Sequence, residues 1–168
     1  MPSGCLRILV VDDDLGVIAS YRHVFERLAK VEPKAGLAHL EEELFGAAPA
    51  STGSVSKRLE VDYADCGNGA LHHVEAALLD GRPYAVIFLD VRMPPGPDGL
   101  STAEAIRRLD GDVHIVFVSG FSDYAETELS ARVRPPERLH YVRKPVPPAN
   151  LRKLATTLTV LWAAGQGA

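Results

Sequence analysis

The segment Ala85-Val-Ile-Phe-Leu-Asp90 is a run of apolar residues that stops at an aspartate. The segment Ile8-Leu-Val-Val-Asp-Asp13 repeats this plan near the start of the chain. Short continuous apolar runs are typical of strands that are buried on both faces of a parallel sheet. Both segments therefore predict central strands that carry acidic side chains at their carboxyl ends.

Helical patterns follow each of five predicted strands along the chain. Apolar residues recur in them at the spacing that gives a helix one buried face. The predicted strands are 8–11, 59–64, 85–89, 115–118 and 139–142, and the predicted helices are about 17–28, 70–79, 100–109, 124–133 and 151–161. This alternation predicts one parallel sheet covered by helices on both faces, with ligands bound at the carboxyl ends of the strands.

The stretch between the first predicted helix and the second strand is longer than a direct connection requires. Leu37, Leu40 and Leu44 recur within it at helical spacing, and a segment rich in Ala, Ser and Gly follows. We therefore expect an extra amphipathic helix and a loop, inserted at about residues 30–58. A helix this short is unstable alone, so it packs either on its own domain or on a partner.

Length and composition are those of one globular domain, and we take residues 1–168 as a single unit. The formal net charge of -4 and the lack of a basic stripe argue against nucleic-acid binding. The longest apolar runs are too short to span a membrane. Cys5 and Cys66 match neither a disulfide framework nor a metal motif, which favours a cytoplasmic location.

Polar residues stand at the ends of four predicted strands: Asp12 and Asp13, Asp90, Ser119 and Lys144. Carboxylates that converge on one pocket repel each other unless a cation lies among them, and oxygen ligands suit Mg²⁺. A lysine ammonium and a serine hydroxyl can both contact the oxygens of a phosphoryl group. The set predicts a phosphoryl-transfer site that works by positioning and charge neutralisation.

Four short motifs at these strand ends resemble the signature of response-regulator receiver domains, in the family's order. They are Val-Val-Asp-Asp at 10–13, Leu-Asp-Val-Arg-Met-Pro at 89–94, Val-Ser-Gly at 118–120 and Lys-Pro at 144–145. The resemblance covers nearly the whole chain apart from the insertion. It implies a flavodoxin-like (βα)5 α/β fold with strand order 2-1-3-4-5. It also implies a two-component signalling switch, not a metabolic enzyme, that is phosphorylated by a histidine kinase or histidine phosphotransfer protein.

The resemblance also assigns the residues of the metal site. It makes Asp90 the phosphoacceptor, and Asp12 and Asp13 the acidic pair that binds Mg²⁺ beside it. Asp13 is the more direct ligand of the pair. The backbone carbonyl of Arg92 completes the protein's share of the coordination.

Three further residues receive roles from the same resemblance. Lys144 contacts the phosphoryl group, and the peptide bond that follows it is often cis in the family. Ser119 takes the place of the switch hydroxyl, and Tyr141 takes the place of the switch aromatic. Phosphorylation is expected to move both of these side chains and to remodel the last two strand–helix units.

Two stretches depart from the usual family pattern. The loop Met93-Pro-Pro-Gly-Pro-Asp-Gly99 is about one residue longer than usual. With the insertion and Phe121-Ser-Asp-Tyr124, it resembles a subgroup found as modules of larger bacterial sensory proteins. The small, Gly-rich end of the chain fits a linker to a C-terminal output module or the tail of a free-standing receiver. The last helix could also pair with a second copy, giving a homodimer.

Three rival interpretations fit less well. A phosphatase of the haloacid-dehalogenase type also starts with a strand and Asp-x-Asp, but it would leave Asp90 without a role. A dinucleotide enzyme needs Gly-x-Gly-x-x-Gly after its first strand, which is missing here. A degenerate receiver that only docks would not need the full set of site residues. The histidines show no ligand spacing, so the phosphohistidine is expected on another protein.

Overall fold

A parallel five-stranded sheet forms the centre of the computed structural model, which describes residues 5–30, 58–120 and 124–166. The strands are β1 (Cys5–Val11), β2 (Arg58–Ala64), β3 (Val86–Asp90), β4 (His114–Ser119) and β5 (Leu139–Arg143). Their order is β2-β1-β3-β4-β5, and each neighbouring pair is parallel. The flavodoxin-like sheet and its 2-1-3-4-5 order, expected from the resemblance, are confirmed.

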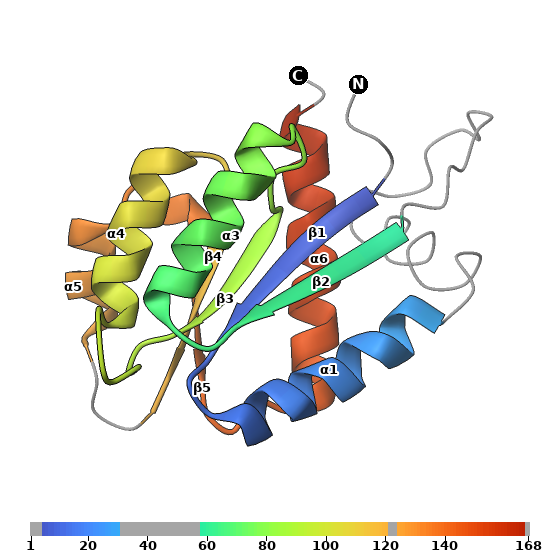
Figure 1. Ribbon diagram of the computed structural model, residues 1–168, viewed down its shortest axis with the longest axis horizontal. Coiled ribbons are helices and arrows are strands. Elements are labelled where there is room, and N and C mark those ends of the chain that lie inside the picture. Colours follow the sequence, from blue (N-terminus) through green and yellow to red (C-terminus); the bar gives the residue numbers. More distant parts are fainter. Residues whose placement is uncertain (1–4, 31–57, 121–123, 167–168) are drawn as a thin grey trace.

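Helices cover both faces of this sheet (Figure 1). They are α1 (Leu15–Lys30), α3 (Gly67–Leu79), α4 (Gly99–Leu109), α5 (Glu126–Arg132) and α6 (Pro148–Gln166), with a short 3-10 turn at Pro136–Arg138. Helices α3, α4 and α5 pack on one face, and α1 and α6 pack on the other. The inserted helix expected at about 30–58 lies outside the described residues.

Alternating side chains of the central strands build the two halves of the core. In β3, all five residues are buried, which explains the unbroken apolar run of its sequence. Phe88 points to the α1 side, where its ring packs against Tyr21 and Phe25 with centroids 6.0 and 5.9 Å away. Leu89 points to the α3 and α4 side. Burial on both faces is what the central place of β3 in the sheet requires.

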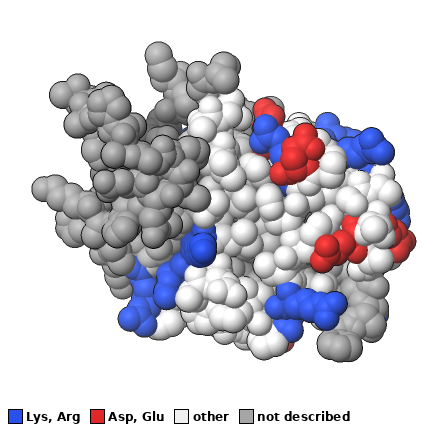
Figure 2. Space-filling view, turned by 180° about the vertical axis from the view of Figure 1, so that it is seen from behind, with Lys and Arg blue, Asp and Glu red and all other residues white. Residues whose placement is uncertain are grey.

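Charged side chains are sparse over much of the surface that Figure 2 shows from behind. The charged residues there form a few small groups, with uncharged surface between the groups. Helix α6 has no Lys, Arg, Asp or Glu from residue 154 to its end at Gln166. Among the described residues, no helix combines the length and the apolar character that crossing a membrane requires.

Two histidines meet at the amino-terminal end of the sheet, far along the strands from the acidic residues. The Nδ1 atom of His114 lies 3.1 Å from the Nε2 atom of His140 on the neighbouring strand. Burial, with His140 and two arginines as lesser causes, lowers the pKa of His114 to about 4. The pair is therefore neutral near pH 7, and it is a contact that the spacing of histidines in the sequence did not indicate.

Candidate functional site

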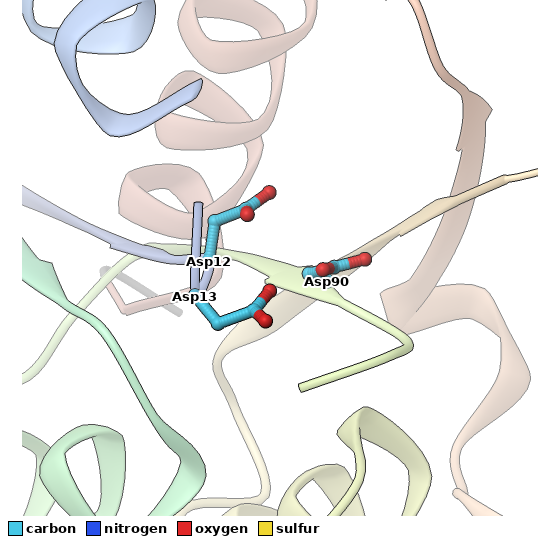
Figure 3. A group of neighbouring side chains, drawn as sticks. All are labelled: Asp12, Asp13 and Asp90. Atoms are coloured by element: carbon cyan, nitrogen blue, oxygen red, sulfur yellow. The ribbon is translucent and has the colours of Figure 1, made fainter. Parts of the chain in front are cut away.

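Three carboxylates meet at the carboxyl ends of β1 and β3 (Figure 3). Asp12 and Asp13 directly follow β1, and Asp90 is the last residue of β3. One oxygen of each lies within 4.8 Å of one oxygen of each of the others. Asp12 and Asp90 are buried, whereas Asp13 is exposed at the rim. The sheet register accounts for the meeting, because Val11 and Leu89 are direct neighbours in the β1–β3 pair.

Asp14, which follows Asp12 and Asp13, caps a helix and does not point into the cluster. Asp14 accepts hydrogen bonds from the backbone N–H groups of Gly16 and Val17, at 2.8 and 3.3 Å, and so caps α1. Asp12 in turn accepts one from the N–H of Asp14 at 2.9 Å. A phosphatase that uses the first and third acidic residues would need Asp14 in the pocket. The capping role of Asp14 therefore weighs against the haloacid-dehalogenase interpretation.

Lys144 reaches the same carboxylates from the loop after β5. Its Nζ atom lies 2.8 Å from Oδ2 of Asp12 and 3.4 Å from Oδ2 of Asp90. Its backbone N–H donates to the carbonyl of Ser119 at 2.9 Å, which ties the loop to the end of β4. The Lys144–Pro145 peptide bond is cis, as the resemblance implied. The structure thus brings together residues that lie far apart in the chain.

The carboxylates of the site repel one another. Burial and the neighbouring Asp12 raise the pKa of Asp90 to about 6, and Lys144 only partly offsets this. Burial works against the charge of Lys144, but hydrogen bonding and attraction to the two carboxylates outweigh it and raise the pKa of the ammonium. Lys144 contacts two of the three carboxylates, and a divalent cation among them would relieve their mutual repulsion. A donor set made of carboxylate oxygens suits a hard ion such as Mg²⁺.

The other two residues expected at the site lie further out. Ser119 ends β4 at the same edge of the sheet and is partly buried. Tyr141 lies on β5 with its ring stacked on Phe117, the centroids 6.1 Å apart. The Tyr141 hydroxyl donates to the carbonyl of Glu126, in the first turn of α5, at 3.4 Å. Tyr141 thus contacts α5 and not the acidic cluster.

Asp98 and Gly99, at the end of the lengthened loop, hold the stretch after Asp90 in place, a role that the sequence did not indicate. Asp98 caps α4 by accepting from the backbone N–H of Ser101 at 2.8 Å. The N–H of Gly99 donates to the carbonyl of Val91 at 2.8 Å. A Cβ atom on Gly99 would overlap the backbone carbonyl oxygen of Asp90. Only glycine allows the first turn of α4 to rest directly on the backbone of Asp90.

Substitution of Gly99 by alanine tests this close approach. We expect Gly99→Ala to destabilise the fold by about 1–3 kcal/mol, because the added methyl group must displace backbone and not a flexible side chain. Gly111→Ala is the matched control, since a Cβ there meets nothing within 4 Å, and its stability should stay close to that of the original chain. Urea unfolding measures the free energy of unfolding of both variants. Equal losses of stability would show that the close contact at Gly99 is not the cause of the destabilisation.

A cleft of about 500 Å³ opens beside the cluster. It is lined by residues of the loop after Asp90 and by one residue just before α5: Val91, Arg92, Met93, Pro94, Gly96, Asp98 and Tyr124. The Arg92 N–H lies 3.4 Å from Oδ1 of Asp90. The hydroxyl of Tyr124 donates to Oδ2 of Asp98 at 2.7 Å across the cleft. The lengthened loop therefore forms most of the wall of a cleft next to Asp90 in the chain.

The chain also matches a known family over more than half of its length. The response regulator receiver domain matches residues 51–156. The chain belongs to this family. The matched part of the receiver domain contains Asp90, Ser119 and Lys144, whereas Asp12 and Asp13 precede it. The place of those two aspartates beside Asp90 comes from the structure.

Solved structures share the fold of this receiver domain. A CheY-like receiver domain protein of Methanospirillum hungatei is 18% identical with a TM-score of 0.66, and the match covers 96% of this chain and 98% of that one. A two-component transcriptional regulator, AraC, of Clostridium phytofermentans is 25% identical, with a TM-score of 0.64 and coverages of 97% and 99%.

A third similar structure is the N-terminal domain of a response regulator/sensory box/GGDEF three-domain protein of Carboxydothermus hydrogenoformans. It is 18% identical with a TM-score of 0.63, and the match covers 95% of this chain and 98% of that one. No curated protein sequence gives a significant match. The chain is thus a receiver domain of two-component signalling, similar in fold to several such domains.

Proposed function

We propose that this receiver domain is a phosphorylation switch in which Asp90 accepts a phosphoryl group from a phosphohistidine. The observation that carries the proposal is the buried Asp90 carboxylate, grouped with Asp12 and Asp13 and contacted by Lys144. The donor is a histidine kinase or a histidine phosphotransfer protein of the cytoplasm. The chain then acts as a signalling domain whose only catalysis is its own phosphorylation and dephosphorylation.

The acidic cluster fits one Mg²⁺ ion. The side chains of Asp12, Asp13 and Asp90 would hold it, and the backbone carbonyl of Arg92 would complete the protein's ligands. When bound, the ion supplies positive charge that neutralises the phosphoryl oxygens and the crowded carboxylates. Burial and Asp12 raise the pKa of the metal-free Asp90 carboxyl to about 6, and a cation beside it would favour the ionised form.

The reaction then depends on the residues of the chain itself. An oxygen of the ionised Asp90 carboxylate attacks phosphorus in line, and the bond from phosphorus to the donor's imidazole nitrogen breaks. The electron pair of that bond returns to the ring nitrogen. Lys144 neutralises charge on the equatorial oxygens from its position beside Asp90. Ser119, at the neighbouring strand end, can donate its hydroxyl hydrogen to a phosphoryl oxygen.

The response travels to the surface formed by α5, β5 and α6. Phosphorylation favours an arrangement in which Ser119 moves toward the phosphoryl group and Tyr141 turns inward, away from the carbonyl of Glu126. The domain thus exchanges between two arrangements, and the phosphorylated Asp90 is more stable in one of them than in the other. The remodelled surface then contacts a C-terminal output module or a second copy of the chain. The Carboxydothermus structure shows that a domain of this fold can belong to a three-domain protein.

Labelling with a small phosphodonor tests the proposed function. Acetyl phosphate with Mg²⁺ should add one phosphoryl group per chain, on Asp90, as seen by mass spectrometry of the protein and its peptides. The group should be lost with hydroxylamine, which cleaves acyl phosphates, and chelation of Mg²⁺ should prevent its addition. Absence of labelling, or labelling at a residue outside the acidic cluster, would contradict the proposal.

A further inference from the structure

Helix α5 (Glu126–Arg132) is anchored mainly by polar contacts. Its only buried side chain is Leu129, and Ala125 at its start provides no side-chain cap. At its far end, Arg132 pairs with Glu104 of α4 through two hydrogen bonds of 2.9 and 3.0 Å. Just before its start, Tyr124 reaches α4 as well. A short helix with so little buried apolar surface depends on such contacts for its position.

The contact of Tyr124 is directed at Asp98. The tyrosine hydroxyl donates to Oδ2 of Asp98 at 2.7 Å, while the other carboxylate oxygen caps α4 through Ser101. Burial opposes ionisation of Asp98, but these hydrogen bonds and the nearby Arg132 outweigh it and lower the pKa of the carboxyl. The acceptor is thus charged near neutral pH, and hydrogen bonds to charged groups are stronger than those between neutral groups.

Asp98 is in turn fixed relative to the phosphoacceptor. Gly99, the next residue, donates to the carbonyl of Val91 and lies so close to the carbonyl of Asp90 that a Cβ would not fit. The contact from Tyr124 to Asp98 therefore joins two regions of the chain. One is the backbone at Asp90, and the other is the connection that leads from Ser119 at the end of β4 into α5.

We propose that Tyr124 is a positioning residue of the switch: its hydrogen bond to Asp98 holds the start of α5 in the resting arrangement and restrains the response to phosphorylation. This inference rests on the proposed function of Asp90. If Ser119 moves toward a phosphoryl group on Asp90, the chain that follows Ser119 moves with it. Tyr124, tied to a fixed Asp98, resists that movement, so the bond must break or reform before α5 can shift.

The contacts at the site agree with a resting arrangement. Lys144 pairs directly with Asp12 and Asp90, and the hydroxyl of Tyr141 contacts the carbonyl of Glu126 at the start of α5. Tyr124 itself has 36% of its surface exposed, so its bond competes with water and is weak enough to open. Removing the bond should shift the population toward the phosphorylated arrangement and raise the affinity for a phosphoryl mimic.

Beryllofluoride with Mg²⁺ serves as the mimic, and fluorine NMR of the bound species measures its affinity. Tyr124→Phe removes the hydroxyl and keeps the ring. Asp98→Ser keeps a residue that caps α4 and removes the second acceptor oxygen. Each variant should bind beryllofluoride about three- to tenfold more tightly than the original chain. This is the shift expected when the resting arrangement loses one exposed hydrogen bond. The double variant should equal the single ones, because both remove the same bond.

Tyr63→Phe is the matched control, since Tyr63 lies on β2, at the opposite edge of the sheet from β5. It should leave the affinity unchanged. A merely structural role of Tyr124 would lower thermal stability without tightening the binding, and that result overturns the inference. Unchanged or weaker binding in Tyr124→Phe, or additive effects in the double variant, overturns it as well. Failure of the original chain to bind beryllofluoride would instead count against the proposed function.

Discussion

Asp90→Asn is expected to abolish phosphorylation by acetyl phosphate and to stabilise the metal-free protein. The amide cannot attack phosphorus, so labelling should be lost entirely. The folded chain also holds the ionised Asp90 at a cost, because burial and Asp12 raise its pKa from 3.8 to about 6. A group whose pKa is raised on folding favours the protonated state, so its cost is absent below about pH 4 and complete above about pH 6. The variant should be about 2–3 kcal/mol more stable at pH 7.5.

Urea unfolding as a function of pH checks the second part of this prediction. Without Mg²⁺, the difference between the variant and the original chain should shrink toward zero as the pH falls to 4. Addition of Mg²⁺ should stabilise the original chain more than the variant, because an ion that binds only the folded state stabilises it by mass action. Full labelling of Asp90→Asn would refute the assignment of the phosphoacceptor. A gain in stability that does not depend on pH would refute its electrostatic explanation.

Asp13→Ala is expected to weaken Mg²⁺ binding by at least about tenfold, because it removes one of a few carboxylate ligands. The fold should stay intact, since the side chain of Asp13 is exposed and its removal also relieves repulsion in the cluster. Titration calorimetry with Mg²⁺ measures the affinity, and circular dichroism measures the fold.

Asp65→Ala provides the control for this experiment. Asp65 is an exposed aspartate that directly follows β2 at the same edge of the sheet, and it is not a member of the cluster. It makes the same change in net charge, so it should weaken binding only slightly. Equal losses in both variants would mean that Asp13 acts through its charge alone. No loss in Asp13→Ala would exclude it as a ligand.

The sequence predicted the sheet because its signals are local. An apolar run such as Val86–Asp90 can be buried on both faces only in a central strand, and its helices show their buried face through spacing alone. The motifs that contain Asp12, Asp90 and Lys144 resembled one family in the right order, and the structure brings these three side chains together. The assigned roles of these residues, and of Ser119, Tyr141 and the Arg92 carbonyl, stay predictions for the experiments above.

Other features escaped the sequence because they join residues with no shared motif. Gly99, the first residue of α4, stands in the sequence only as the end of a loop. Its close contact with the backbone of Asp90, which leaves no room for a Cβ atom, appears only in the structure. His114 and His140 lie on separate strands. Only the register of β4 and β5 brings Nδ1 of His114 to 3.1 Å from Nε2 of His140. Tyr124 and Asp98 meet because two loops converge on one edge of the sheet.

By itself, then, the sequence determined which segments become strands and helices and which polar residues end them, because both follow from short-range patterns of apolar and polar residues. The tertiary structure decided the contacts between the ends of those segments. It placed Lys144 against two buried carboxylates and tied α5 to the loop after Asp90 through Tyr124. Such contacts depend on strand register, helix packing and loop path together, and no local stretch of sequence contains that information.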